Sequence, residues 1–422
     1  MPPVPRVEVR SAEETRTVIE AFLKNCRQPA LLEPGEELLV LDGDNHALEM
    51  RGSRLTLQAW DRTRNLTRRI TGIKETSAAR LEMTVERFPR REGPLFLVDL
   101  ARRAGADLGR RSGRLVFRER FRLFLRRQFP EWTLAEVSTE PNLEFSLSPV
   151  FPRAFLKHGQ HGWAAIVCPP DGDAGAVVSF GLIWLSYLRA RERRIAVEGL
   201  AIYVPVGRGQ AAALRLLCLD AAAARFELFG YTEEDFLVGI DPRDHGNLDT
   251  RLEPCRGTEL PRPRGREYPE AWLESQTRAQ IETLDATLRR EPIYGQVPAF
   301  AGGDRGILDL LAVDHAGRLA IVELKASADL HLPLQAIDYW IRVKWHLARG
   351  EFPAYGYFPG IELQPEPPRI LLVSPCLDFH PTSETILRYF SPAIDVVRIG
   401  LAVEWRKGLQ VMFRLQGAET PH

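Results

Sequence analysis

Residues 306–340, GILDLLAVDHAGRLAIVELKASADLHLPLQAIDYW, hold the most informative part of the chain. Two apolar runs, 306–313 and 318–325, have the length and composition of β-strands. Residues 314–317 between them, Asp-His-Ala-Gly, have the composition of a turn. The stretch therefore predicts a β-hairpin, and a helix is expected to follow it.

Three charged side chains lie on these two apolar strands. In a three-residue loop with Gly317 in the left-handed region, Asp309 falls directly opposite Glu323. Lys325 shares a face with Glu323, because side chains alternate along a strand. An apolar strand gains nothing by burying two carboxylates and an amine. The pattern therefore predicts a metal site, although a surface hairpin with an incidental Glu–Lys pair is the simpler alternative.

The chemistry of phosphodiester hydrolysis suits these residue types. The reaction needs charge neutralised on the transferring phosphate and a water made nucleophilic. Hard oxygen ligands favour Mg²⁺ or Mn²⁺, which serve both needs. A lysine beside the metal can orient the water and stabilise developing charge. The expected cofactor is therefore Mg²⁺ or Mn²⁺.

Two motifs in this stretch resemble a known superfamily. Asp309, followed by Glu323-Leu324-Lys325, resembles the D…(D/E)-x-K signature of the PD-(D/E)XK nucleases. The spacing of residues 335–339, QAIDY, resembles the Q-x-x-x-Y extension of their RecB-like and NucS-like branches. The resemblance covers roughly residues 268–400, and Leu308 stands where the name-giving proline would be.

The resemblance implies a restriction-endonuclease-like core in the C-terminal part of the chain. It also implies a metal held by two carboxylates and one backbone carbonyl, a lysine serving the water, and a Gln–Tyr pair holding the site or a DNA phosphate. The residues so assigned are Asp309, Glu323 and the Leu324 carbonyl for the metal, Lys325 for the water, and Gln335 and Tyr339 for the pair.

Such folds also place a glutamate on the helix before the hairpin. A helix is expected over residues 269–290, with a proline at its first position and apolar residues at roughly helical spacing. Glu270 fits the branch pattern E-x-x-apolar with Leu273, and Glu274 is the alternative metal ligand. Either glutamate could instead be an acidic first-turn residue that complements the helix dipole.

Composition excludes several classes of protein. The chain has 422 residues, 45% hydrophobic and 27% charged, as expected for a soluble protein of two or three domains. Its five cysteines are far apart and form no CxxC pair, which argues against a zinc site or a disulfide framework. No apolar run has the length of a membrane span or a signal peptide. We therefore expect a cytoplasmic protein that does not enter a membrane.

A net charge of zero hides a strong asymmetry. Residues 51–130 contain 20 Arg and one Lys against 8 acidic residues, a local excess of 13 positive charges. One basic region in a neutral chain fits a polyanionic partner, most simply DNA. A solvated surface in an arginine-rich protein is the alternative. The candidate nucleic-acid contacts are Arg68, Arg69, Arg90, Arg91, Arg110 and Arg111.

The predicted fold class is α/β (α+β), in three domains. Residues 1–99 form a β-rich domain that is basic in its second half, and residues 100–252 form an α/β domain. Residues 253–268, rich in Pro, Gly and Arg, form a linker. Residues 269–422 form the nuclease-like domain.

The middle domain shows signs of being a degenerate copy of the last one. Residues 166–186 align with residues 321–341 at a constant offset of 155. At the positions equivalent to the predicted ligands the middle segment has only apolar residues or cysteine. The alternative is two unrelated α/β segments that share a common element order. The replacements are Ala154 for Asp309, Cys168 for Glu323, Pro170 for Lys325, Phe180 for Gln335 and Trp184 for Tyr339.

The sequence thus predicts a metal-dependent nuclease that hydrolyses phosphodiester bonds of DNA, with an arginine-rich region that binds the nucleic acid. The alternative is a catalytically silent DNA-binding or scaffold protein of a repair or defence complex. The sequence does not separate DNA from RNA. Cutting both strands of a duplex with one site per chain would favour a homodimer.

Overall fold

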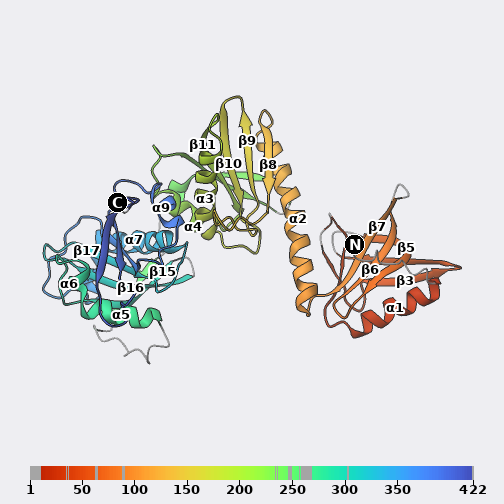
Figure 1. The fold of residues 1–422 in the computed structure, drawn as a ribbon, viewed down its shortest axis with the longest axis horizontal. Helices are drawn as coiled ribbons and strands as arrows, with labels where there is room; N and C mark the ends of the chain where they lie inside the picture. Colours follow the sequence, from red (N-terminus) through yellow and green to blue (C-terminus); the bar gives the residue numbers. More distant parts are fainter. Residues whose placement is uncertain are drawn as a thin grey trace. The chain divides into compact units, whose positions relative to one another are not determined.

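The computed structural model describes residues 11–420 apart from 35, 37, 62–64, 88–90, 233, 235, 246–249, 256, 258–268 and 302–303. The chain divides into two compact units, Met1–Leu123 and Phe124–His422 (Figure 1). The described residues form three β-sheets and several helices. The predicted mixed α/β class with several domains is confirmed.

The first unit is one antiparallel sheet with a helix on it. Helix α1 (Ala12–Asn25) begins at a Ser11–Glu14 capping box and packs Ile19 and Phe22 on the sheet. The strand order is β2-β1-β7-β6-β5-β4-β3. Buried residues alternate with exposed ones along β4, as a sheet with one covered face requires. The strands are β1 (Pro29–Leu32), β2 (Leu39–Val40), β3 (His46–Arg51), β4 (Arg54–Trp60), β5 (Asn65–Thr76), β6 (Arg80–Arg87) and β7 (Arg91–Asp99).

Helix α2 (Arg103–Gln128) contains the boundary between the two units. It is rich in arginine, and Arg111, Arg122, Arg126 and Arg127 are exposed. Phe121, Phe124 and Leu125 are fully buried. The helix therefore combines a buried apolar stripe with a basic surface.

The first sheet of the second unit is mixed. Its order is β13-β12-β11-β10-β9-β8, with β10, β11 and β12 parallel to one another. Helices α3 and α4 form the crossover connections between the parallel strands. The elements are β8 (Thr133–Ser138), β9 (Arg153–His158), β10 (His161–Val167), α3 (Ala176–Arg191), β11 (Ala196–Pro205), α4 (Gln210–Leu216), β12 (Arg225–Tyr231), β13 (Leu237–Ile240) and the 3₁₀ turn η1 (Pro242–His245).

The second sheet of this unit has its seven strands in chain order, β14 to β20, with β17, β18 and β19 parallel. Its elements are β14 (Thr250–Leu252), α5 (Pro269–Ala279), α6 (Ile281–Leu284), β15 (Tyr294–Ala301), β16 (Asp304–Val313), β17 (Leu319–Leu324), α7 (Leu332–Ala348), α8 (Glu351–Ala354), β18 (Arg369–Pro375), α9 (Thr382–Leu387), β19 (Val396–Leu401) and β20 (Val411–Gln416).

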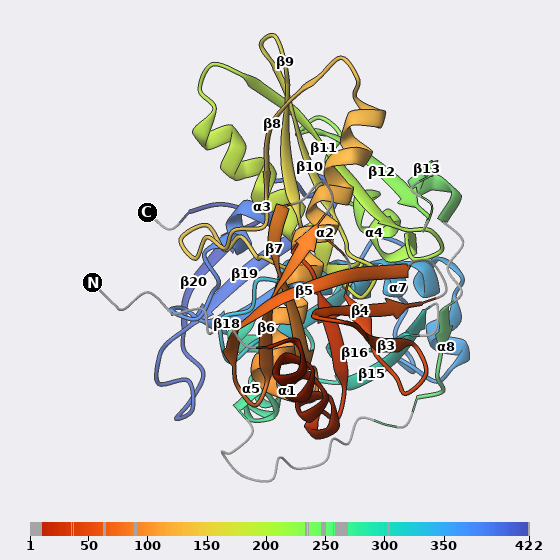
Figure 2. The ribbon, with the colours of Figure 1, turned by 90° about the vertical axis from the view of Figure 1, so that its right-hand side faces the viewer.

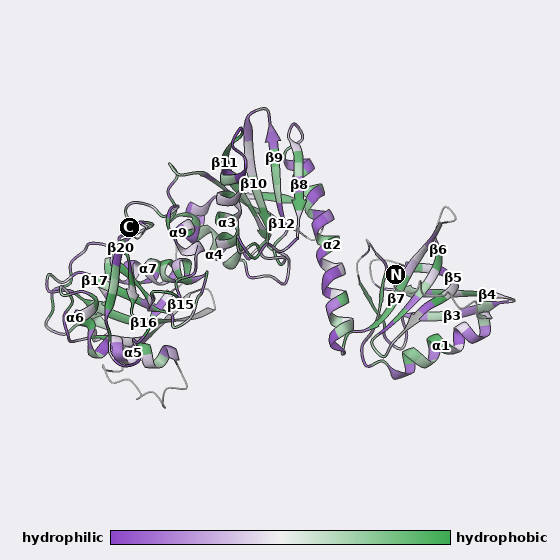
Figure 3. Ribbon diagram, viewed as in Figure 1, coloured by the Kyte–Doolittle hydropathy of each residue, from purple (hydrophilic) through white to green (hydrophobic). Residues whose placement is uncertain are grey.

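One hydrophobic core joins these two sheets. Helices α3, α4, α7 and α9 lie between them (Figure 1), and Figure 2 shows α3, α4 and α7 from the side. A second core covers the opposite face of the β14–β20 sheet, where α5 and α6 pack. The central strands of both sheets are coloured as hydrophobic in Figure 3. These strands are buried on both sides, which explains their nearly unbroken apolar sequences.

The helix expected over residues 269–290 is shorter than predicted. It ends at Ala279, since Gln280 has φ −131° and ψ 38°, and a short helix, α6, follows. Leu288 is buried in a bridge to Asp314 instead of lying on a helix. The apolar spacing that suggested one long helix is satisfied by tertiary packing in the second core. Most of the predicted linker 253–268 lies outside the described residues.

No helix in the described parts of the chain is both long enough and apolar enough to span a bilayer.

Candidate active site

The predicted hairpin is confirmed in its register. Strands β16 and β17 pair Leu310 with Val322 and Val313 with Leu319. Continued by one step, this register sets Asp309 opposite Glu323. Gly317 has φ +96°, and a Cβ there would collide with the carbonyl oxygen of Glu362. The turn therefore needs glycine, and the turn fixes which residues face each other.

Asp309 lies where the backbone pairing of the hairpin stops. The last paired residues are Leu310 and Val322, and beyond them the amide N–H of Leu324 donates to Asp309 Oδ2 at 2.8 Å. Burial raises the pKa of Asp309 to about 6, although the Leu324 amide and the Lys325 charge oppose the rise. A carboxylate is thus fixed at the strand end with one oxygen anchored.

Glu323 is fully buried, and in the described structure neither of its carboxylate oxygens has a hydrogen-bond partner. Burial raises its pKa well above the usual range, and the charge of Asp309 raises it further. An ionised carboxylate that is buried without a partner destabilises the folded state by roughly several kcal/mol, unless a nearby cation compensates its charge. The two acids therefore form a site that is destabilised without a cation.

Lys325 follows Glu323 on the same face. Its amide N–H donates to the Val373 carbonyl at 3.0 Å, which fixes the backbone beside β18. Its side chain is 15% exposed, and its Nζ lies 4.0 Å from Glu270 Oε1. Its positive charge lowers the pKa of both Asp309 and Glu323. The amine is thus held close to the two acids with partial access to solvent.

Gln335 and Tyr339 both lie on α7, one helical turn apart, so their side chains are on the same face of the helix. Burial raises the pKa of Tyr339 to about 12, and the charge of Glu323 contributes. The phenol therefore stays protonated at neutral pH and can donate a hydrogen bond. The structure thus places the predicted Gln–Tyr pair beside the acids.

The two glutamates of α5 differ sharply in environment. Glu270 is 58% exposed, whereas Glu274 is 7% exposed. Burial raises the pKa of Glu274 to about 7, the Asp309 charge adds to the rise, and a hydrogen bond with Gln296 opposes it. Glu270 is thus close to the lysine, and Glu274 is a buried acid that titrates near neutrality.

Gln296 is a site residue that the sequence did not indicate. In the β15–β16 ladder Gly295 pairs with Leu310 and Val297 with Leu308, so Gln296 stands opposite Asp309. Its φ of +50° is unusual for a residue other than glycine. Such a conformation costs about 1–3 kcal/mol and is most often kept where function requires it. No local signal in the sequence marks this position, since residues 294–301 were not expected to form a strand.

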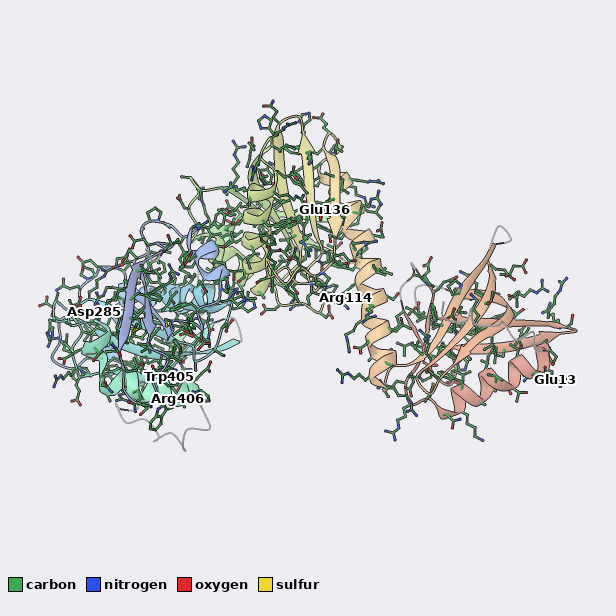
Figure 4. All side chains as sticks on the ribbon, viewed as in Figure 1. Glu13, Arg114, Glu136, Asp285, Trp405 and Arg406 are labelled. Carbon is green, nitrogen blue, oxygen red and sulfur yellow. The ribbon has the colours of Figure 1, made fainter. Side chains whose placement is uncertain are left out.

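A pocket of about 530 Å³ opens onto Asp309, Gln296 and the two glutamates of α5, whereas Glu323, Lys325 and the Gln–Tyr pair do not line it. The pocket is also lined by Ser327 and Arg406. After Gln296, Arg406 is the second site residue that the sequence did not indicate. Arg406 lies in the turn after β19 and close to α5 (Figure 4), with its guanidinium 4.8 Å from the ring of Trp405. A cation at the rim of an acidic pocket suits a phosphate. The lining residues are Pro269, Glu270, Ala271, Glu274, Gln296, Asp309, Leu324, Ala326, Ser327 and Arg406.

The donor set fits a hard divalent cation bound by few protein ligands. Among the described residues no three His, Cys, Asp or Glu side chains are close enough together to enclose a metal. The available ligands are Asp309, the unpartnered Glu323 and the Leu324 carbonyl. All are oxygen donors, which Mg²⁺ and Mn²⁺ prefer, and Mg²⁺ commonly keeps several water ligands. Space therefore remains for water and a phosphate oxygen.

The candidate nucleic-acid arginines are engaged to different degrees. Arg68 donates through two nitrogens to the buried Glu33, Arg69 pairs with Glu86 at 3.0 Å, and Arg110 pairs with Asp107. Arg111 is exposed. Arg90 and the side chain of Arg91 lie outside the described structure. The Glu33 pair accounts for Arg68 without any nucleic acid, and the role of the others stays a prediction.

Comparison with known proteins adds little. No protein-family model and no curated protein matches the chain. Among solved structures it is similar to a repair endonuclease from Pyrococcus abyssi, with 11% identity over 90% of this chain and 92% of that one. The TM-score is 0.18, which is too low to support an argument. Only the residues of the site therefore point to a function.

Proposed function

We propose that the chain is a metal-dependent nuclease that hydrolyses phosphodiester bonds of DNA. The observation that carries this proposal is Glu323, which is fully buried beside Asp309 and whose two carboxylate oxygens find no hydrogen-bond partner among the residues that the structure describes. A core strand gains no stability from such a residue, whereas a divalent cation would satisfy it. The resemblance of the Asp-Glu-x-Lys pattern to the PD-(D/E)XK nucleases agrees with this chemistry.

Asp309, Glu323 and the Leu324 carbonyl would hold Mg²⁺ or Mn²⁺. When bound, the ion would neutralise phosphate charge and make a water molecule more acidic. The Leu324 amide keeps Asp309 in place through the 2.8 Å hydrogen bond, which leaves the other carboxylate oxygen for the ion. Strong burial of Glu323 excludes bulk water from this side of the site.

The remaining side chains would act on the substrate and on the attacking water. Lys325, partly exposed and 4.0 Å from Glu270, can orient the attacking water and stabilise charge on the phosphate. Glu274 can exchange a proton near neutral pH, because its pKa is about 7. Arg406 at the rim can bind a neighbouring phosphate. The exposed arginines of α2 would add contacts with the DNA backbone that do not depend on sequence.

Cleavage of a panel of labelled DNAs by the pure chain tests this proposal. Single-stranded, duplex, flap, mismatched and four-way-junction substrates are each incubated with Mg²⁺, Mn²⁺ or EDTA. We expect metal-dependent cutting by the native chain and no cutting by Lys325→Ala that is detectable on the same time scale. The matched control is Arg290→Ala, because Arg290 is 81% exposed and pairs with Glu282 rather than with a site residue.

Two results would contradict the proposal. Cutting that persists in Lys325→Ala would mean that another group, or a contaminant, performs the chemistry. Salt-sensitive DNA binding without cutting by any form would favour the silent scaffold that the sequence left as an alternative.

A further inference from the structure

We infer that residues 124–245 are a catalytically silent copy of the C-terminal nuclease-like half, joined to it as an internal pseudo-dimer, so that each chain cuts one strand of a duplex. The inference rests on the proposed nuclease function and adds to it the number of strands cut. Four observations support it: matching topology, reciprocal contacts, a closed counterpart site and an asymmetric interface.

Apart from the additional edge strand β14, the two sheets of the second unit have the same topology. In each, two antiparallel strands lead into three parallel strands, and an antiparallel strand completes the edge. In each, one helix follows the first parallel strand and a second helix follows the next: α3 and α4 in one sheet, α7 and α9 in the other. A shared element order of this length argues for duplication rather than coincidence.

The packing of the two halves is reciprocal. Helix α3 packs on α9, and α7 packs on α4, so each half presents its first helix to the other half's second. Leu219 forms an antiparallel bridge with Phe390. These residues are 171 apart, as are Leu216 and Leu387, which end α4 and α9. A residue that pairs with its own counterpart lies on a two-fold axis, as in the isologous interface of a dimer.

The counterpart of the active site is closed in the middle half. Cys168 replaces Glu323 and is fully buried. The carbonyl of Pro169, at the position of Leu324, accepts a hydrogen bond from the Gly172 amide at 2.9 Å. The indole of Trp184, at the position of Tyr339, donates to the Ala154 carbonyl at 2.8 Å. Each position that would hold a metal in the C-terminal half is apolar or internally bonded here.

The chain around Cys168 is held by further hydrogen bonds. Arg208 donates to the carbonyls of Pro170 and Gly172, and the Tyr231 hydroxyl donates to the Cys168 carbonyl at 2.7 Å. These bonds tie together the segment that follows β10, where the C-terminal half has its lysine. At the described positions equivalent to the predicted metal ligands, the middle half therefore offers no carboxylate.

The interface favours pairing within one chain over pairing of two C-terminal halves. Arg215 of α4 forms two hydrogen bonds with Asp338 of α7, at 3.0 and 2.7 Å. At the symmetry-related contact the counterparts are Ile386 and Ile183, both buried. If two C-terminal halves paired in this way, Asp338 would meet an isoleucine and lose its partner. An unpaired charge of this kind disfavours the wrong assembly.

One active centre therefore stands where a nuclease dimer would have two. The strands of a duplex run in opposite directions, so a two-fold pair of centres can address both, whereas one centre addresses one. The arrangement supplies the second half without a second cut. The middle half also takes the place of the second chain in the homodimer that the sequence suggested, because it already covers this interface of the C-terminal half.

A circular supercoiled duplex carrying the structure cut best in the panel tests this inference. We expect nicked circles to accumulate first, and linear DNA only after many further events. We also expect the native chain to sediment with the mass of one chain, 47.7 kDa. Lys325→Ala should leave no residual nicking, and Pro170→Ala, its matched counterpart in the silent half, should cut at the native rate.

The outcomes separate the inference from the proposed function. Linear DNA as the first product, or a dimer in solution, would each overturn the pseudo-dimer with one centre and leave the nuclease standing. If the native chain cuts no DNA in either metal, the proposed function fails and the inference fails with it.

Discussion

The two halves of the second unit have the same framework and opposite chemistry. Where the C-terminal half holds a buried carboxylate without a partner, Glu323, the middle half holds the buried thiol Cys168. Burial raises the pKa of Cys168 to about 12, so this group is neutral and is compatible with an apolar core. The fold therefore forms without these charges. The buried carboxylates lower the stability of the fold, and only a function explains why they are present.

The largest expected effect separates the two halves through paired substitutions. Lys325→Ala removes the amine beside the acids and should reduce cleavage by about 10²–10⁴-fold, the usual contribution of a positioned proton-transfer group. Pro170→Ala, at the equivalent position, should leave the rate unchanged. Steady-state cleavage of a labelled substrate under Mg²⁺ measures both. Equal losses in the two variants would contradict the division into an active and a silent half.

The interface of the halves gives the next largest effect. Asp338→Ala leaves the guanidinium of Arg215 without its partner in a mostly buried position and should cost about 3 kcal/mol of unfolding free energy. The double variant Arg215→Ile with Asp338→Ile copies the residues of the symmetry-related positions, which are the buried isoleucines Ile386 and Ile183, and should regain most of this loss. Urea denaturation compares the three chains.

If the double variant were as unstable as the single one, the two contacts would not be equivalent. The pseudo-two-fold relation would then lose its energetic support.

A smaller effect concerns the pH dependence of stability, which measures directly how much the buried acids destabilise the fold. The folded chain holds the pKa of Asp309 near 6, above its value in the unfolded chain, so between about pH 4 and 6 the folded state binds more protons. Stability in EDTA should therefore fall as pH rises through this window. Asp309→Asn keeps an acceptor for the Leu324 amide and should be more stable than the native chain at pH 7, by about 2 kcal/mol.

Thermal unfolding at pH 4 and pH 7 measures this gain, which should disappear at pH 4 because both chains are then neutral at residue 309. Added Mg²⁺ should stabilise the native chain and not the variant. A variant that is less stable than the native chain at pH 7 in EDTA would contradict the view that the acids are a cost.

Local patterns predicted the hairpin, and long-range packing decided the rest of the site. The register that opposes Asp309 and Glu323 follows from alternation and one glycine, so the sequence alone contains it. Gln296 and Arg406 join the site through strand pairing and a turn more than eighty residues downstream, which no local pattern shows. The long helix expected over 269–290 was wrong because buried leucines at helical spacing can also pack from a bend.

The choice between Glu270 and Glu274 shows the same limit. Both fit the helix pattern, and they differ only in how α5 packs on the sheet: the side chain of Glu274 is buried and that of Glu270 is 58% exposed. Sequence periodicity gives the face of a helix but not the depth to which each turn is covered. The internal repeat was visible in the sequence as an alignment, but the reciprocal helix contacts needed the structure.

The smallest effect that we predict concerns Tyr339. Tyr339→Phe removes only the hydroxyl, which lies on the same face of α7 as Gln335 and beside the acids, and should reduce cleavage by about 5-fold, since one hydrogen bond contributes about 1 kcal/mol. Its counterpart Trp184→Phe loses the bond to the Ala154 carbonyl and should lower stability by a similar amount with no change in cleavage rate. Rate and unfolding measurements on both variants thus distinguish a hydroxyl that serves the reaction from an indole that fills a silent site.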